Sequence, residues 1–271
     1  MTARYAVFGN PIHHSRSPRI HAQFAHETGQ DLSYEAILAP LDGFESCVAQ
    51  FRQSGGLGAN ITVPFKEQAY ALCTQRSARA ELAGAVNTIK FDADTIWGDN
   101  TDGAGLVADL TRNLGVTLAG TRILLLGAGG AARGVIGPLL DSAPAQLVIA
   151  NRTASRAHAL AAHFSAHTKL SVTGCGLDEL TSAFDLIINA TSASLAGELP
   201  SLPATIFTPD LLAYDMMYGP TLTPFLQLAQ QHGARIADGL GMLVEQAAEA
   251  FYVWRGVRPD TQAVIAALRA A

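Results

Sequence analysis

Lys66 is a candidate for chemistry at a polar ligand. It ends residues 60–66, Asn-Ile-Thr-Val-Pro-Phe-Lys, which also carry the amide of Asn60 and the hydroxyl of Thr62. Alternate residues of a strand face the same side, so Asn60 and Thr62 share a face at a strand end, with Lys66 just past the turn. An amine, an amide and a hydroxyl there can bind oxygen atoms and handle a proton. The alternative is an ordinary surface lysine.

Asp102 lies in a second polar segment, residues 98–103, Gly-Asp-Asn-Thr-Asp-Gly. This composition is also typical of a simple turn, because short polar side chains bond their own backbone there. Metal binding is a weaker alternative, since the segment lacks the full loop spacing of a calcium site. We expect no metal.

Ser15 and Ser17 form a third polar segment, Ser-Arg-Ser-Pro. Their spacing lets both hydroxyls face one way just before a helix N-terminus, an arrangement that suits a carboxylate ligand. Ser17 is also a good N-cap for a helix over 18–29, with Pro18 at the first helical position and Gly29 as the stop. Capping alone is the alternative interpretation.

A glycine turn stands at residues 122–132, where an apolar strand runs into Gly127-Ala-Gly-Gly-Ala-Ala132. This is the Gly-x-Gly-x-x-Ala form of the dinucleotide-binding turn. Gly127 permits the tight turn, Gly129 lets backbone approach the pyrophosphate, and Ala132 keeps the helix close to the sheet. Glycine-rich turns also occur without nucleotides.

The segment after the next strand favours NADP over NAD. An NAD site expects a carboxylate about 20 residues after the glycines, to hold the ribose hydroxyls. The chain instead has Asn151, Arg152, Thr153 and Arg156. Arginines four apart share a helical face, and a guanidinium pairs well with the 2′-phosphate of NADP. Two solvated arginines at a helix start are the alternative.

The elements that position these residues alternate between strand and helix. Strands are predicted at 5–9, 33–38 and 58–63, with helices at 18–29 and 41–54, and 87–91 with 95–97 read as a hairpin. Further strands are expected at 122–126, 146–150, 170–173 and 186–189, and two more, 205–208 and 211–215, would extend that sheet. Helices close the chain from 240 to about 254 and after 260. Such alternation indicates parallel sheets covered on both faces.

Glycine clusters near 103–105 and 238–241 divide the chain. We predict an α/β protein of two domains. Residues 1–103 form an N-terminal substrate domain with a mixed, mostly parallel sheet. Residues 104–239 form a Rossmann-type nucleotide-binding domain. The active site is expected in the cleft between them, whose closure would exclude water.

Composition excludes several classes of function. The 271 residues are 49% hydrophobic and 15% charged, and the net charge of −5 gives no reason to expect nucleic acid or an anionic membrane as partner. Three isolated cysteines form no CxxC pair, which fits a reducing compartment. No apolar run reaches the roughly 18 residues that span a bilayer. We expect a cytoplasmic protein, monomeric or homodimeric, with a small-molecule substrate.

Nine motifs in order resemble the shikimate dehydrogenase family along nearly the whole chain. They are Phe8-Gly-Asn-Pro-Ile with His14-Ser-Arg-Ser-Pro18, Gly58-Ala-Asn-Ile-Thr-Val-Pro-Phe-Lys66, Leu82-Ala-Gly-Ala-Val-Asn-Thr88, Gly98-Asp-Asn-Thr-Asp-Gly103, Gly127-Ala-Gly-Gly-Ala131, Asn151-Arg-Thr153, Asn189-Ala-Thr-Ser192, Tyr218-Gly-Pro with Thr223-Pro-Phe225, and Asp238-Gly-Leu-Gly-Met242 with Gln246.

The resemblance implies reversible reduction of 3-dehydroshikimate to shikimate by NADPH, with Lys66 and Asp102 as the catalytic pair. It implies that Ser15 and Ser17 hold the substrate carboxylate and that Asn60, Thr62, Asn87, Asp102 and Gln246 reach the ring hydroxyls. Because Gln246 must then reach the substrate, the resemblance also implies that the C-terminal helices of residues 240–271 complete the substrate domain. Tyr218 would lie beside the ligand and Met242 beside the nicotinamide. The implied NADP residues are Gly127, Ala128, Gly129, Gly130, Ala131, Asn151, Arg152, Thr153, Arg156, Thr191, Ser192, Met216, Gly239 and Met242.

Several alternatives stay open at this point. Lys66 either donates the proton or acts mainly by charge and position. A quinate/shikimate dehydrogenase preferring NAD, or a non-catalytic sensor that binds nucleotide and ligand, would share many motifs. Helical spacing alone makes Gln246 a solvated residue at the edge of an apolar stripe. Many members of the family have glycine where this chain has Ser194, so the cofactor loop here could differ in shape. His13 also departs from the family pattern, and we expect it to be an exposed residue without a catalytic role.

Overall fold

The computed structural model describes residues 2–191 and 201–270. The chain divides into two compact units: Met1–Gly105 with Leu243–Ala271, and Leu106–Met242. These limits lie two residues after position 103 and three after position 239. Both fall inside helices, α5 (Asp102–Ala108) and α9 (Leu240–Arg255), so a helix carries the chain at each crossing.

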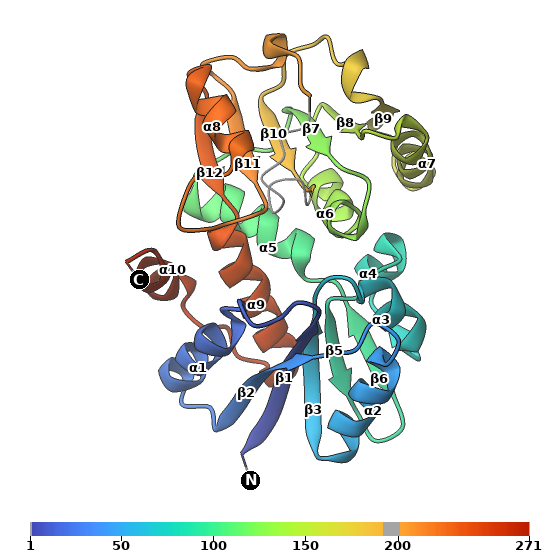
Figure 1. Cartoon of the computed structure of the whole chain (residues 1–271), viewed down its shortest axis with the longest axis vertical. Coiled ribbons are helices and arrows are strands. Elements are labelled where there is room, and N and C mark those ends of the chain that lie inside the picture. Colours follow the sequence, from blue (N-terminus) through green and yellow to red (C-terminus); the bar gives the residue numbers. More distant parts are fainter. Residues whose placement is uncertain (1, 192–200, 271) are drawn as a thin grey trace. The chain divides into compact units, whose positions relative to one another are not determined.

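The first unit contains a six-stranded mixed sheet in the order β2-β1-β3-β5-β6-β4. Its strands are β1 (Ala3–Gly9), β2 (Leu32–Leu38), β3 (Gly56–Ile61), β4 (Gln75–Arg76), β5 (Thr88–Phe91) and β6 (Ile96–Asp99) (Figure 1). β1 pairs in parallel with β2 and β3, and β5 is antiparallel to β3 and β6. The predicted hairpin is therefore confirmed as β5–β6.

Alternate side chains of β1 pack into different cores on the two faces of this sheet. Ala6 and Phe8 face a core that includes Phe44 and Phe65, whereas Ala3 and Tyr5 face Trp254. Tyr5 stacks on Trp254 at 4.6 Å between ring centroids, and Trp254 Nε1 donates to Ile89 O at 2.9 Å. The helices of this unit are α1 (Ser17–Thr28), α2 (Phe44–Gln53), α3 (Lys66–Leu72), α4 (Ala78–Ala83), the larger part of α9 and α10 (Thr261–Arg269).

Helix α1 begins one residue earlier than predicted. Arg16 is its N-cap and Ser17 its first residue, so the expected capping by Ser17 is wrong. Pro18 then stands in the first turn, where its missing N–H costs nothing. Gly29 ends the helix in the left-handed conformation at φ 64°, as its lack of a Cβ allows.

The second unit contains a parallel sheet in the order β12-β11-β10-β7-β8-β9. Its strands are β7 (Arg122–Leu126), β8 (Gln146–Ala150), β9 (Ser171–Cys175), β10 (Leu186–Asn189), β11 (Leu212–Asp215) and β12 (Arg235–Asp238), with helices α6 (Gly130–Asp141), α7 (Ala154–Ser165) and α8 (Pro224–Gln231). Counted from β7, this is the 3-2-1-4-5-6 order of dinucleotide-binding folds, which confirms the predicted fold class.

Three parts of the second unit differ from expectation. The predicted strand at 205–208 is wrong: Ala204–Ile206 is a 3-10 turn, opened by Ile206 N donating to Pro203 O at 3.3 Å. Pro203 and Pro209, on either side of this segment, have no N–H to donate to a neighbouring strand, and this disfavours a longer strand here. β12 and the π-helix Asp109–Asn113, which continues α5, were not predicted. Within the described residues, no helix has the length and apolar character to span a bilayer.

Candidate active site

Strand register brings the polar segments of the first unit to one edge of its sheet. Asn60 near the end of β3 pairs with Thr88 at the start of β5, and Thr88 pairs with Asp99 at the end of β6. Strand β5 is antiparallel to both β3 and β6. The chain just before β5 therefore lies at the same edge of the sheet as the chain just after β3 and just after β6. Lys66, Asn87 and Asp102 occupy those positions.

Lys66 and Asp102 form an ion pair. Lys66 Nζ donates to Asp102 Oδ2 at 2.5 Å, and the two side chains are 16% and 8% exposed. The other carboxylate oxygen, Oδ1, accepts from Asn87 Nδ2 at 2.8 Å. Lys66 is the first residue of α3, and its carbonyl accepts from Val86 N at 3.0 Å, which ties it to the segment before Asn87. The predicted pair is thus in contact and held from both sides.

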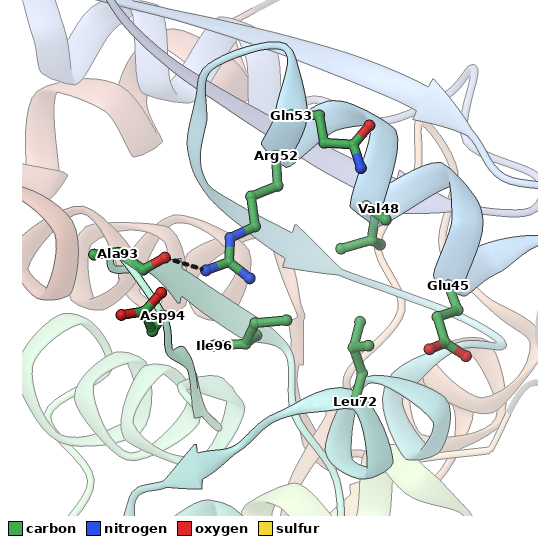
Figure 2. A pocket seen from close by; sticks show the side chains of 9 residues that line it. Glu45, Val48, Arg52, Gln53, Leu72, Ala93, Asp94 and Ile96 are labelled. Carbon is green, nitrogen blue, oxygen red and sulfur yellow. Dashed lines mark hydrogen bonds between the residues drawn. The ribbon is translucent and has the colours of Figure 1, made fainter.

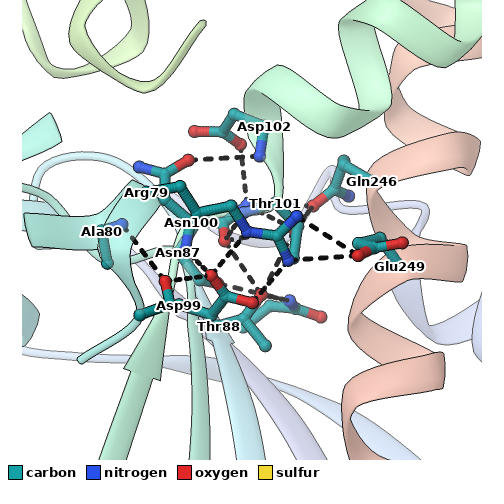
Figure 3. A network of polar contacts seen from close by, with 12 residues as sticks. Arg79, Ala80, Asn87, Thr88, Asp99, Asn100, Thr101, Asp102, Gln246 and Glu249 are labelled. Carbon is teal, nitrogen blue, oxygen red and sulfur yellow. Dashed lines mark hydrogen bonds and ion pairs between the residues drawn. The ribbon is translucent and has the colours of Figure 1, made fainter. Parts of the chain in front are cut away.

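Asn87 connects Asp102 to helix α9 (Figure 3). Its Nδ2 lies 3.2 Å from Gln246 Oε1 and 2.9 Å from Thr101 Oγ1, and its Oδ1 accepts from Thr101 N at 2.8 Å. Gln246 is half-buried, and its Nε2 donates to Leu243 O at 2.9 Å. Helical spacing alone was therefore wrong about Gln246, because the polar partners that bury it come from distant parts of the sequence.

Asn60 is fixed by a residue that the sequence did not single out. Tyr34 Oη donates to Asn60 Oδ1 at 2.7 Å, and Asn60 Nδ2 donates to Thr88 Oγ1 at 3.1 Å. Burial raises the pKa of the Tyr34 hydroxyl well above its usual range, so it remains a donor. A tyrosine in the middle of a strand carries no sequence signal for this role.

Ser15 and Ser17 lie after β1, whose Phe8 pairs with Ile61 of β3. Ser17 is buried, and its N–H donates to Ser15 Oγ at 3.3 Å. Thr62, just beyond β3, donates its N–H to Phe8 O at 2.9 Å. These three predicted residues follow adjacent strand ends of the same sheet. His13 and His14 beside them are exposed, as expected for His13.

The glycine turn of the second unit leaves open space at the start of α6. Gly127 has φ 108°, and a Cβ there would lie 3.2 Å from Thr191 Cγ2, so only glycine fits without strain. A Cβ at Gly129 or Gly130 would meet nothing within 4 Å. Gly129 caps α6 without a side-chain bond, so the first N–H groups of the helix and its dipole are available to a phosphate. Ala132 is fully buried, as expected.

The other predicted nucleotide residues follow the carboxyl ends of aligned strands. Leu126, Ala150, Asn189, Asp215 and Asp238 end β7, β8, β10, β11 and β12 in register. Ligands of such sheets bind outside these ends, where the strand order reverses. Thr191 donates through Oγ1 to Asn189 Oδ1 at 2.7 Å, beside the glycine turn.

Met216 and Gly239 are neighbours at this edge. A Cβ at Gly239 would lie 2.2 Å from Met216 O, so the close approach requires glycine. Tyr218, half-buried, follows β11, and Met242 is buried in the first turn of α9. Ser192 and Ser194 lie outside the described residues.

Arg152 and Arg156 are exposed beyond the end of β8. Helix α7 begins at Ala154 with Thr153 as its N-cap, so Arg152 precedes the helix and the prediction that both arginines share a helical face is wrong. Asn151 Nδ2 donates to Thr153 O at 3.0 Å and shapes this loop. With two cations and no carboxylate in residues 151–156, the loop suits a dinucleotide with an added phosphate.

A separate hollow of about 550 Å³ lies between α2, the end of α3 and the turn that joins β5 to β6 (Figure 2). It is lined by Glu45, Val48, Ala49, Arg52, Gln53, Leu72, Ala93, Asp94 and Ile96. Arg52 bonds the carbonyls of Asp92 and Ala93 across it. None of the predicted site residues lines it. Among residues 2–191 and 201–270, no group of three or more potential ligands could hold a metal.

Three family models match the chain. They describe a "Shikimate dehydrogenase substrate binding domain" at residues 7–89, "Shikimate / quinate 5-dehydrogenase" at 109–196 and a "Shikimate 5'-dehydrogenase C-terminal domain" at 239–269. A protein of Dechloromonas aromatica named "Shikimate dehydrogenase (NADP(+))" is 62% identical over 100% of this chain and 98% of that protein.

Two solved structures are similar over almost the whole chain. The Ael1 enzyme from Pseudomonas putida is 51% identical, with a TM-score of 0.92 and 98% of each chain covered. Shikimate 5-dehydrogenase from Thermus thermophilus, in complex with NADP(H) and shikimate, is 35% identical, with a TM-score of 0.88 and 99% of each chain covered.

Proposed function

The chain belongs to the shikimate dehydrogenase family, and we propose that it catalyses the reversible NADPH-dependent reduction of 3-dehydroshikimate to shikimate, a step of chorismate and aromatic amino-acid biosynthesis. Relatives at about 60% identity carry the name of this enzyme with NADP+. The observation that carries the proposal is the largely buried Lys66–Asp102 pair at 2.5 Å, in which Lys66 is half-buried and Asp102 is held by Asn87.

Lys66 is proposed to serve the oxygen of the reacting group. Addition of hydride to the keto carbon leaves negative charge on that oxygen, and a cationic donor beside it lowers the energy of the transition state. The ammonium group has three N–H donors, and the contact with Asp102 uses one, so the others can reach the substrate. The proton that completes the new hydroxyl would pass from Nζ to the same oxygen.

Asp102 would orient Lys66 and stabilise its charge, and with Asn60, Thr62, Asn87 and Gln246 it would recognise the ring hydroxyls. The hydroxyls of Ser15 and Ser17 are proposed to bind the carboxylate. The side chains of Asn60, Asn87 and Asp102 are already bonded to neighbours, so they would meet the substrate without large rearrangement. Tyr218 is proposed as a further substrate contact. These roles stand as proposals.

Bound NADPH supplies the hydride. The open space at Gly129 and Gly130 with the N-terminus of α6 fits its pyrophosphate, and Arg152 with Arg156 fits its 2′-phosphate. Ala128, Ala131, Asn151 and Thr153 complete the two loops. Thr191, Met216, Gly239 and Met242 would line the rest of the site, in which Ser192 was also predicted.

The experiment that tests this function is oxidation of shikimate and of quinate by the purified protein, with NADP+ and NAD+ in parallel, followed at the absorbance band of the reduced nicotinamide. We expect fast turnover with shikimate and NADP+ only. Turnover of quinate, or equal use of NAD+, would identify a broader quinate/shikimate enzyme. NADP+ binding without turnover in any pair would identify a sensor and contradict the proposal.

The remaining expectations concern the setting of the enzyme. We propose that it acts in the cytoplasm, where its three isolated cysteines would stay reduced, and that it is a monomer or homodimer with no nucleic-acid or membrane partner. Sedimentation of the purified protein gives its mass directly, and a mass above that of two 28.4 kDa chains would contradict the proposal.

A further inference from the structure

Arg79 of α4 binds a buried carboxylate three residues before Asp102 (Figure 3). Asp99 ends β6 and is 2% exposed. Arg79 Nε donates to Asp99 Oδ1 at 2.7 Å and Arg79 Nη2 donates to Asp99 Oδ2 at 2.5 Å. This is a fork-to-fork pair, the geometry in which a guanidinium fixes a carboxylate in orientation as well as position.

Hydrogen bonds continue from Asp99 to the backbone of Asp102. Asn100 N donates to Asp99 Oδ1 at 2.8 Å, and Asn100 Nδ2 donates to Ala85 O at 3.0 Å. Asn100 Oδ1 accepts from Asp102 N at 3.2 Å. The orientation of Asp102, and so of its partner Lys66, therefore depends on a chain of bonds that begins at Arg79.

The same guanidinium also reaches helix α9. Arg79 Nη1 and Nη2 each lie 3.2 Å from Glu249 Oε1. Glu249 follows Gln246 by three residues, so the two share one face of the helix. Arg79 is thus bonded both to the loop that carries Asp102 and to the helix that carries Gln246.

We propose that Arg79 is a positioning residue for the reaction: its guanidinium holds the 99–102 loop and helix α9 at one spacing, so that Asp102 and Gln246 meet the same substrate ring. The inference rests on the proposed function. A guanidinium can bind Asp99 through two parallel N–H groups and still reach Glu249, whereas a lysine ammonium has three donors but no planar fork to fix the orientation of Asp99.

The test compares Arg79→Lys with Arg76→Lys and the wild-type protein. Arg76 is the matched control, because it pairs with Glu81 at 3.1 Å and bonds Tyr70 O. Arg79→Lys keeps a cation beside Asp99, which protects folding, but loses the fork. Misplacement of reacting groups by about 1 Å can cost a hundredfold in rate, so we expect kcat/KM for shikimate to fall about ten- to a hundredfold. Arg76→Lys is expected to match the wild type.

A second variant, Glu249→Ala, removes the contact of Arg79 with α9, together with the Arg258 Nη1–Glu249 Oε2 pair at 2.8 Å, and leaves both partners of the Arg79–Asp99 pair in place. We expect the KM for shikimate to rise severalfold while kcat changes less, because Gln246 is proposed to act in binding. Thermal unfolding of each variant separates lost fold from lost positioning. Unchanged KM in Glu249→Ala overturns the inference, as does wild-type kcat/KM in Arg79→Lys or an equal loss in Arg76→Lys. Absence of turnover in the wild type would instead overturn the proposed function.

Discussion

In the first unit, Asn60, Asn87 and Asp102 are nearly inaccessible and bonded to neighbouring side chains, whereas in the second unit Gly129 and Gly130 face open space and Arg152 is exposed. The substrate end is thus built from side chains whose partners are already in place. The proposed nucleotide end is built from backbone and from an exposed cation.

This difference has a physical origin. A reacting ring needs donors and acceptors at fixed points, and buried groups bonded to one another supply them without reorganisation. A pyrophosphate needs N–H groups and room, which a glycine turn at a helix N-terminus supplies without any particular side chain. Substitutions should therefore act on turnover in the first unit and on nucleotide affinity in the second.

The largest effect is expected for Asp102→Asn. An amide cannot accept from both Lys66 and Asn87 without turning its own NH₂ toward one of them, so the pair loses its geometry. We expect kcat for shikimate oxidation to fall about a hundredfold or more, in line with loss of acid–base catalysis. Steady-state kinetics at saturating NADP+ measure it, with exposed Asp94→Asn as control. A kcat of Asp102→Asn equal to that of the wild type would contradict the claim that substitutions in the first unit act on turnover.

Two glycine variants separate conformation from open space at the nucleotide end. Gly127→Ala places a side chain at φ 108° and should destabilise the fold by about 1–3 kcal/mol. Gly129→Ala meets no protein atom, so its unfolding midpoint should match the wild type, but its methyl group occupies the space proposed for pyrophosphate. We expect the KM for NADP+ to rise about tenfold, equivalent to about 1.4 kcal/mol. An unchanged KM would place the nucleotide elsewhere.

An effect of similar size, but selective for one nucleotide, is expected for Arg152→Ala. Hydrogen bonds to charged groups contribute about 1.5–3 kcal/mol, so the KM for NADP+ should rise by about tenfold or more. The KM for NAD+ should stay the same, because NAD+ lacks the 2′-phosphate. Parallel titrations with both nucleotides measure the ratio, and exposed Arg235→Ala serves as control. Equal changes for both nucleotides would argue against a 2′-phosphate contact.

The smallest effect on activity is expected at His21, which is fully buried beside Tyr34. Burial lowers the pKa of His21 from 6.5 to about 3, outweighing the neighbouring Asn60 side chain, which favours the charged form. At a pH between about 3 and 6.5, His21 is protonated in the unfolded chain and neutral in the folded chain. Stability therefore falls as the pH drops from about 6.5 toward about 3, by up to about 1.4 kcal/mol per pH unit.

His21→Phe should flatten this slope while leaving kcat near that of the wild type. Urea unfolding at several pH values in that window measures the slope, and exposed His158→Gln should keep it. An identical slope in wild type and His21→Phe would show that His21 does not titrate on unfolding.

Sequence reasoning succeeded where local patterns suffice. The apolar strands β7, β8 and β10 have the predicted limits. Each is a short apolar run that leads directly into a recognisable motif: the glycine turn after β7, the arginine segment after β8 and the Asn-Ala-Thr motif at the end of β10. Gly29 was recognised as a helix stop because the left-handed conformation there needs no partner from elsewhere. The strand predicted at 205–208 was wrong because the prediction gave more weight to apolar composition than to the flanking prolines, and Ala204–Ile206 forms a 3-10 turn instead.

The polar network was harder to predict because its partners are distant in the chain. Tyr34 and Asn60 are 26 positions apart, and Asn87 and Gln246 are 159 apart. The order of the sheet brings the first three together: β2, which carries Tyr34, is joined to β3 through β1, and β3 pairs with β5, which begins just after Asn87. Periodicity within one element carries no information about that order. The polar segments of Lys66 and Asp102 were visible in the sequence, but their assignment as one catalytic pair came from the resemblance to a family.

The measurement that tests this account most directly is a comparison of turnover and substrate binding in Lys66→Ala. The account predicts that kcat for shikimate falls at least about a hundredfold, while the shikimate Kd, from a binding titration in the presence of NADP+, stays near the wild-type value. Unchanged turnover in the folded variant would contradict the account and remove Lys66 from the mechanism.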